Sequence, residues 1–223
     1  MMGEKPQRKT ALKNYILYTA LGVLGFVIIS SLFIAAKGLQ GNKFEKESSS
    51  ESLMQAIGYD GESLEGYLDV LGKTLAKEPI IVKSIENQNT HTQSYDAKKI
   101  KNLDARWREN DALLIDESMK SDLSLWLGEY MQKSGGAILE IIVMDGIGLN
   151  VGQSDKTSDY WQGDEDKFIK SYNKGRGATY IGDLDFDEST GAIQIMTAIP
   201  VSNGKGKVIG AIAVAVNPLK TNL

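Results

Sequence analysis

Four consecutive residues, Asp159-Tyr160-Trp161-Gln162, combine an acid, two large aromatic rings and an amide. Such a set offers a stacking surface together with directional hydrogen bonds, which is the usual composition of a small-molecule pocket wall. An amine or another cation would suit Asp159 by charge pairing and Trp161 by cation–π attraction. A structural role fits the same residues equally well, with Trp161 anchoring a loop to the core and Asp159 capping a turn.

A second acidic group, Asp183, Asp185 and Asp187, alternates along a predicted strand, so the three side chains project to the same face. Three like charges on one face are costly unless water or a cation lies opposite. A solvated strand end is one interpretation. A binding role is the other, and it favours Asp183, which lies deepest in the strand and close to Tyr180.

A third candidate group lies on a predicted helix before the sheet, where Trp107 stands between Arg106 and Arg108. Trp107 continues an apolar stripe, which favours core packing over a place in the pocket. Either arginine could hold a carboxylate ligand by a bidentate contact. Each could equally pair with Asp104 or Glu109 on the surface.

Several kinds of chemistry are disfavoured by composition. The chain has no Cys and a single His, His91, which argues against disulfides, thiolate or His-rich metal sites and a Ser-His-Asp triad. We therefore expect no metal, no cofactor and no enzymatic activity. A net charge of −4 and a pI near 5.2 give no electrostatic footprint for nucleic acid.

The first half of the chain shows helical periodicity. A break is plausible near Gly58–Gly61, Pro79 ends or kinks the first helix, and Gly135-Gly136 stops the last. We expect Trp126 and Tyr130 in the core and His91 in a solvated loop. The three apolar stripes are Leu53, Ile57, Leu64, Leu68, Leu71 and Leu75; Ile100, Leu103, Trp107 and Leu114; and Met119, Leu123, Trp126, Leu127 and Tyr130.

The second half changes to the short apolar runs typical of strands. A short helix is expected over Asp164–Tyr172 and a turn over Asn203–Gly206. A run of helices is followed by five strands, with one short helix after the second strand. This order indicates an α+β domain built on a five-stranded antiparallel sheet. The predicted strands are Ile138–Met144, Leu149–Gln153, Thr179–Phe186, Ala192–Val201 and Val208–Val216.

The N-terminal part indicates a membrane anchor, because residues 14–36 carry no charge and are long enough for a transmembrane helix. A cleaved signal peptide is the alternative, and its apolar core would be shorter. Basic residues before the helix favour a cytoplasmic segment 1–13 and an extracytoplasmic remainder, in the periplasm or outside the cell. A juxtamembrane segment 37–52, a sensor domain 53–217 and a tail 218–223 complete the expected organisation.

The C-terminal half resembles single-Cache domains, also called PDC or PAS-like extracytoplasmic sensors, from about Lys98 to Asn217. The residues that carry the resemblance are Leu103-Asp104, Trp107-Arg108, Val143–Asp145, Gly148–Val151, Thr157–Glu165, Phe186–Gly191, Pro200-Val201, Ile209–Ala211 and Val216-Asn217. The resemblance implies a helix-flanked antiparallel sheet with a small-molecule pocket on one face. Relatives bind amino acids, carboxylates or amines and pass the signal through a following transmembrane helix. That exit helix and the family's amino-acid-binding signature are not present here.

The sequence thus predicts a non-enzymatic, membrane-anchored sensor domain for a small amine, amino acid or carboxylate. The expected partners are that ligand, a single-pass membrane contact, a second copy through the N-terminal helix and a separate signalling protein. Two alternatives stay open. One is a ligand-free scaffold of the same fold in the cell envelope, and the other is the N-terminal part of a longer chemoreceptor or sensor kinase.

Overall fold

The structure is a computed structural model, and it describes residues 60–187 and 192–221. The predicted transmembrane helix over 14–36 lies outside these ranges. Among the helices that the structure does describe, none combines the length and the apolar character needed to cross a bilayer.

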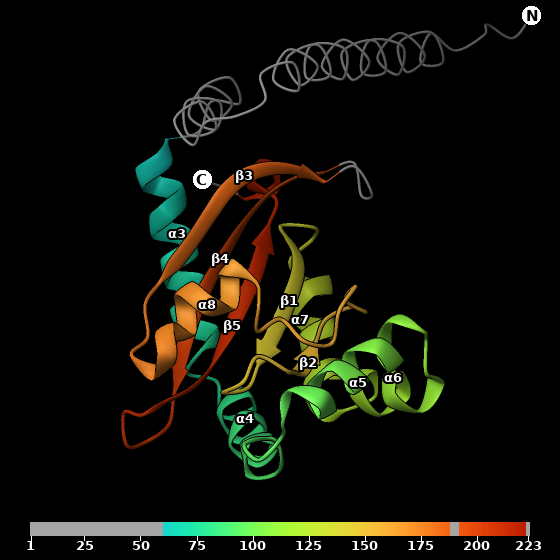
Figure 1. Cartoon of the computed structure of the whole chain (residues 1–223). Coiled ribbons are helices and arrows are strands. Elements are labelled where there is room, and N and C mark those ends of the chain that lie inside the picture. Colours follow the sequence, from blue (N-terminus) through green and yellow to red (C-terminus); the bar gives the residue numbers. More distant parts are fainter. Residues whose placement is uncertain (1–59, 188–191, 222–223) are drawn as a thin grey trace, which may run out of the picture. The chain divides into compact units, whose positions relative to one another are not determined.

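The described chain is an α+β domain around one five-stranded antiparallel sheet, as predicted (Figure 1). The sheet has the strand order β2-β1-β5-β4-β3. Its strands are β1 (Ile138–Met144), β2 (Asn150–Gln153), β3 (Tyr180–Asp187), β4 (Ala192–Ser202) and β5 (Val208–Val216). The helices are α3 (Gly61–Leu75), α4 (Pro79–Thr92), α5 (Ala97–Arg108), α6 (Ala112–Met119), α7 (Asp122–Lys133) and α8 (Asp166–Tyr172), with short 3-10 turns η1 (Asn173–Gly175) and η2 (Pro218–Lys220).

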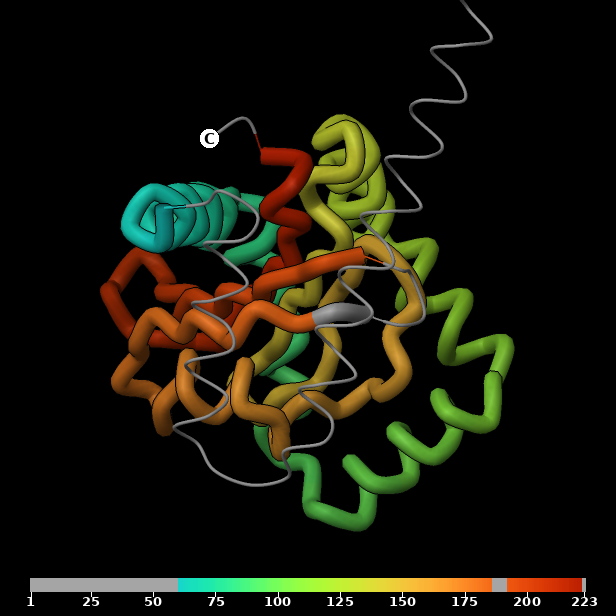
Figure 2. Tube along the Cα trace, turned by 90° about the horizontal axis from the view of Figure 1, so that it is seen from above, coloured from blue at the N-terminus to red at the C-terminus, as the bar shows by residue number. Residues whose placement is uncertain are grey.

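The two faces of the sheet are covered by different helices (Figure 2). On one face, α3, α4 and α7 bury the main core, in which Ile212 and Val214 of β5 are fully inaccessible. On the other face α8 places Phe168 against Ala211 and Ala213. This division follows from the alternation of side chains along β5, where the large residues face one layer and the alanines face the other.

Helix α4 was not predicted. The first helix ends before Pro79, at Leu75, but Pro79 also begins a new helix, because a first-turn position needs no backbone N–H and suits the fixed φ of proline. Ile81, Ile85 and Thr92 form the buried side of this helix, and Ile80 and Val82 pack partly against the main core. His91, expected in a loop, lies exposed in the last turn of α4.

The second apolar stripe also divides. Asn110 adopts a positive φ of 61° between α5 and α6, and the Asp111 side chain then caps α6 by accepting from the backbone N–H groups of Leu113 and Leu114. Trp126 and Tyr130 of α7 are half-buried against the main core, close to the prediction. The result is that α5 and α6 form a separate layer beside β2, around buried Leu103, Trp107, Leu114 and Leu149.

Candidate ligand-binding site

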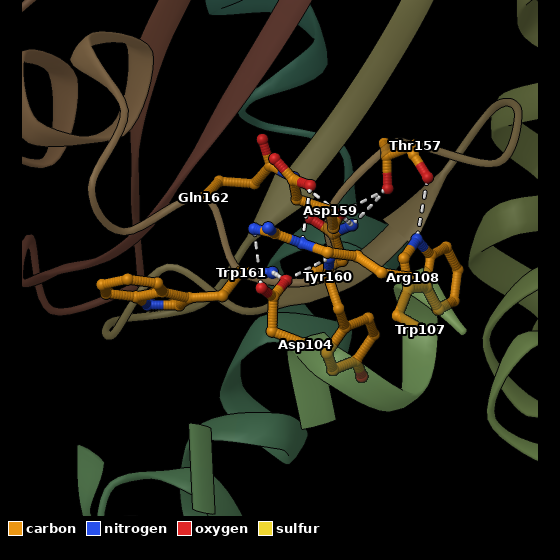
Figure 3. A network of polar contacts seen from close by, with 9 residues as sticks. Asp104, Trp107, Arg108, Thr157, Asp159, Tyr160, Trp161 and Gln162 are labelled. Carbon is orange, nitrogen blue, oxygen red and sulfur yellow. Dashed lines mark hydrogen bonds and ion pairs between the residues drawn. The ribbon is translucent and has the colours of Figure 1, made fainter. Parts of the chain in front are cut away.

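Asp104 of α5 holds the predicted binding loop in place (Figure 3). Its Oδ1 accepts hydrogen bonds from the backbone N–H of Tyr160 at 2.9 Å and of Trp161 at 3.1 Å. The carboxylate is only 13% exposed. In the sequence, Asp104 was considered as a surface partner for an arginine and as part of the family resemblance, with no role in holding the loop. Its contact with residues more than 50 positions away could not be seen in a local pattern.

Arg108 forms ion pairs with two carboxylates, one on α5 and one in this loop. Its Nη2 lies 2.8 Å from Asp104 Oδ2, and its Nε lies 3.1 Å from Asp159 Oδ1. The arginine side chain is 56% exposed, while that of Asp159 is 28% exposed. Two acids against one guanidinium leave the cluster with one net negative charge, which favours a cationic ligand over a simple anion.

The aromatic residues of the loop are held by their polar atoms and by each other. Trp107 is fully buried, and its Nε1 donates to the carbonyl of Thr157 at 2.8 Å. The ring of Tyr160 lies 5.2 Å from that of Trp107, tilted by 37°. Trp161 Nε1 donates to the carbonyl of Ile147 at 2.8 Å, which ties the loop to the β1–β2 turn. Burial raises the pKa of the Tyr160 phenol, with a smaller contribution from the charge of Asp145.

Two buried amide side chains converge on a single carbonyl of the loop. Asn150 Nδ2 donates to the carbonyl of Asp159 at 3.1 Å and to Thr157 Oγ1 at 2.9 Å, and Gln162 Nε2 donates to the same carbonyl at 2.8 Å. Each amide is 1% exposed. Within the described part of the chain, Asn150 Oδ1 and Gln162 Oε1 have no hydrogen-bond partner. Both oxygens are acceptors beside the backbone of Asp159, where a ligand with N–H groups could use them.

The remaining predicted residues lie in other places. Arg106 is turned to Asp111, with 2.7 Å between Nε and Oδ2, and this hydrogen bond lowers the pKa of the Asp111 carboxyl. Tyr180 packs at the edge of the α8 layer, where the ammonium of Lys170 lies 4.8 Å from its ring centroid. Asp183 is exposed on β3 at an irregularity in the pairing with β4.

The structure therefore brings Asp159, Tyr160, Trp161, Gln162 and Trp107 together. It places Arg106, and the pair Tyr180 and Asp183, in separate surroundings. Two contributors were missed by the sequence prediction, Asp104 and Asn150. Asn150 stood in the hairpin motif that carries the family resemblance, but nothing in its neighbours indicated that its amide would reach the later loop.

Comparisons with known proteins give similarities in structure only. No family model and no curated protein matches the sequence. The similar solved structures include the sensor domain of DcuS from E. coli, at 14% identity and a TM-score of 0.43, covering 70% of this chain and 90% of that one. They also include the sensor domain of the V. cholerae histidine kinase DctB, at 15% identity and a TM-score of 0.32, covering 66% of this chain and 58% of that one.

A further similar structure is the ligand-binding domain of the Campylobacter jejuni chemoreceptor Tlp3 in complex with L-valine, at 14% identity and a TM-score of 0.36. It covers 96% of this chain, which spans 65% of the length of the Tlp3 chain. Sensor domains are the class that the sequence resemblance indicated.

Proposed function

We propose that residues 53–217 form an extracytoplasmic sensor domain that binds a small metabolite with an amine or ammonium group and catalyses no reaction. The observation that carries the proposal is the pair of buried, unpartnered amide oxygens, Asn150 Oδ1 and Gln162 Oε1, beside the backbone of Asp159. A buried acceptor without a donor costs about 1–3 kcal/mol. A ligand that donates N–H groups to both oxygens would recover part of that free energy.

The surrounding charges support the same ligand class. Asp159 supplies a carboxylate that an ammonium group can approach from the solvent side, since 28% of the side chain is exposed. Arg108, with 56% exposed, offers a guanidinium for a carboxylate on the same molecule. An amino acid or a related zwitterion therefore suits the cluster better than a dicarboxylate, which would meet two acids and one base.

The membrane anchor belongs to the same proposal. Its support is the uncharged stretch 14–36 followed by an acidic, cysteine-free domain. In this arrangement the domain is a signal input, and a second copy or a separate signalling protein carries the signal onward.

A ligand-free scaffold remains the second candidate, because one observation favours it. The charged groups of the loop already satisfy one another: Asp104 accepts from two backbone N–H groups and Arg108, and Arg108 also pairs with Asp159. A loop fixed in this way is also what a structural element would need.

Thermal unfolding of the purified chain separates the two candidates. The melting temperature should rise with at least one member of a panel of amino acids, amines, carboxylates and purines, because a ligand that binds only the folded state stabilises it. An amine-bearing compound should give the largest rise. At a ligand concentration of about 100 times the Kd, the stabilisation is about 2.7 kcal/mol.

A matched pair of variants tests whether the ligand that raises the melting temperature binds at Asp159. Asp159→Asn keeps the size of the side chain and should remove most of the rise. Asp155→Asn makes the same change at an exposed position of the same loop and should leave it intact. If no compound in the panel raises the melting temperature, the scaffold interpretation replaces the sensor interpretation.

A further inference from the structure

An open groove lies where α3 ends and α4 begins, and none of its lining residues belongs to the candidate ligand-binding loop. Its volume is about 540 Å³. Ala76, Pro79 and Val82 line it from the two helices, and Ile199 and Pro200 line it from β4. We call this the α3–α4 groove. Its floor is thus apolar, although the residues around it are charged.

The walls of the groove are held by close packing and by a fixed turn. At Gly72 of α3, an added Cβ would lie 2.3 Å from Ile199 Cγ1, so the helix and β4 are in direct contact below the groove. In the β4–β5 hairpin, Asn203 Oδ1 accepts from the backbone N–H of Lys205 and of Lys207, each at 3.1 Å. A groove with such walls is preformed, which lowers the entropy cost of binding.

Basic residues dominate the rim. Lys73 already pairs with Asp69 at 2.8 Å, and acids are present at Glu78 and Glu86. The chain as a whole carries a net charge of −4, whereas the rim of this apolar groove is positively charged. Four exposed lysines at the groove form no ion pair within the described chain: Lys77 and Lys83 line it, and Lys205 and Lys207 lie on the hairpin beside it.

We propose that the α3–α4 groove docks an acidic peptide segment of a partner protein, with apolar side chains on the floor and carboxylates at the lysines. The sign of the rim selects an acidic partner. The concave floor selects a chain that can insert side chains, since a bilayer surface is flat and would meet the lysines without filling the groove. The proposal does not depend on the ligand-binding function, because the groove shares no residue with the Asp159 loop.

The experiment uses the full chain and a fluorescein-labelled eight-residue peptide of alternating Glu and Leu, with binding followed by fluorescence anisotropy. The Lys77→Glu/Lys83→Glu variant should bind the peptide about tenfold more weakly than the unmodified chain. Lys98→Glu/Lys101→Glu on α5 is the matched control. It changes the net charge equally, at exposed lysines that do not line the groove, and should bind as the unmodified chain does.

Two further arms distinguish other occupants. Val82→Ser should weaken binding of the Glu-Leu peptide while leaving every charge in place, and circular dichroism should show all variants folded. A peptide of alternating Lys and Leu should not bind. The proposal is overturned if the groove and control variants lose the same affinity, or if the Glu-Leu peptide does not bind at millimolar concentration. It is also overturned if phosphatidylglycerol vesicles or inorganic phosphate bind at the groove lysines and the peptide does not.

Discussion

At the scale of single residues, two carboxylates fix loops that the sequence alone left unconnected. Asp145 is fully buried and accepts four hydrogen bonds, from the backbone N–H groups of Ile147 and Leu149 and from the side chains of Gln88 and Thr92. It thereby joins the β1–β2 turn to α4. Asp104 does the same for the Asp159 loop and α5. Both acids are positioning residues, and their backbone contacts account for the ordered placement of the candidate site.

Tyr160 gives a pH-dependent prediction at the same scale. Its pKa is raised above the ordinary value of 10.0, first by burial, so the folded chain keeps a proton that the unfolded chain releases as pH rises above about 10. Stability from this group is therefore fully present below pH 10 and is lost at higher pH. In urea unfolding, the loss attributable to Tyr160 between pH 8 and pH 11 should be about 1 kcal/mol.

The control for this prediction is Tyr160→Phe, which keeps the ring against Trp107 but cannot ionise. Burial also raises the pKa of Tyr67, so some loss at high pH is expected in the variant too. The difference between the two proteins isolates Tyr160. Identical pH profiles for both would show that Tyr160 ionises as freely in the folded state as in the unfolded state.

At the scale of elements, the contact between α3 and β4 depends on a glycine. Gly72 is buried in the last turns of α3, and its missing side chain lets the helix lie directly on Ile199. Gly66, in the same helix, is exposed and has nothing within 4 Å of an added Cβ. By sequence alone the two glycines look alike, since each is a poor helix former. In the structure they differ, because Gly72 faces Ile199 and Gly66 faces open space.

The two glycines should respond in opposite ways to alanine. Gly72→Ala forces the new methyl group against Ile199 and should cost about 1–3 kcal/mol of unfolding free energy. Gly66→Ala should stabilise the chain by about 0.5–1 kcal/mol, because alanine is the better helix former at an open position. Urea denaturation of both variants measures the difference. A stabilising effect at both positions would contradict the close approach of α3 to β4.

At the scale of the whole described domain, three apolar clusters are arranged around one sheet. The main core lies between the sheet and helices α3, α4 and α7 and includes side chains from all five strands. Trp107, Leu149 and their neighbours form a side cluster beside β2. The side cluster is joined to the rest by polar contacts such as those of Asp145 and by the close approach of Gly148 to Phe168. The candidate site thus lies against a side cluster that is separate from the main core.

A fragment of residues 50–223, which form one compact unit, should nevertheless unfold in a single transition. Trp126 reports on the main core, while Trp107 and Trp161 report on the side cluster. Urea curves from tryptophan fluorescence and from circular dichroism at 222 nm should therefore coincide. A fluorescence transition at lower urea would show that α5, α6 and the Asp159 loop open separately from the sheet.

Local patterns in the sequence were sufficient for much of the architecture. The strands over Ile138–Met144 and Val208–Val216 were predicted to the residue, since β-branched runs bounded by glycine and polar turns define a strand locally. The α+β class and the antiparallel sheet followed from the order of these runs. Helix α4 was missed because its apolar residues are confined to the first two turns, while Glu86–Thr92 is polar and continues no apolar stripe.

For the candidate site, the sequence by itself determined which residues could contact a ligand, through the unusual grouping of acid, aromatics and amide at Asp159–Gln162. Only the tertiary structure decided that Asp104, Arg108 and Asn150 surround that loop, and that Arg106 and Asp183 do not. It also brought the end of α3 to the β4–β5 hairpin and so created the basic groove. The physical reason is that periodicity and turn chemistry act over a few residues. The contacts of Asp104 and Arg108 with the loop, and those that form the groove, join segments 50 to 130 positions apart and exist only once the layers have packed.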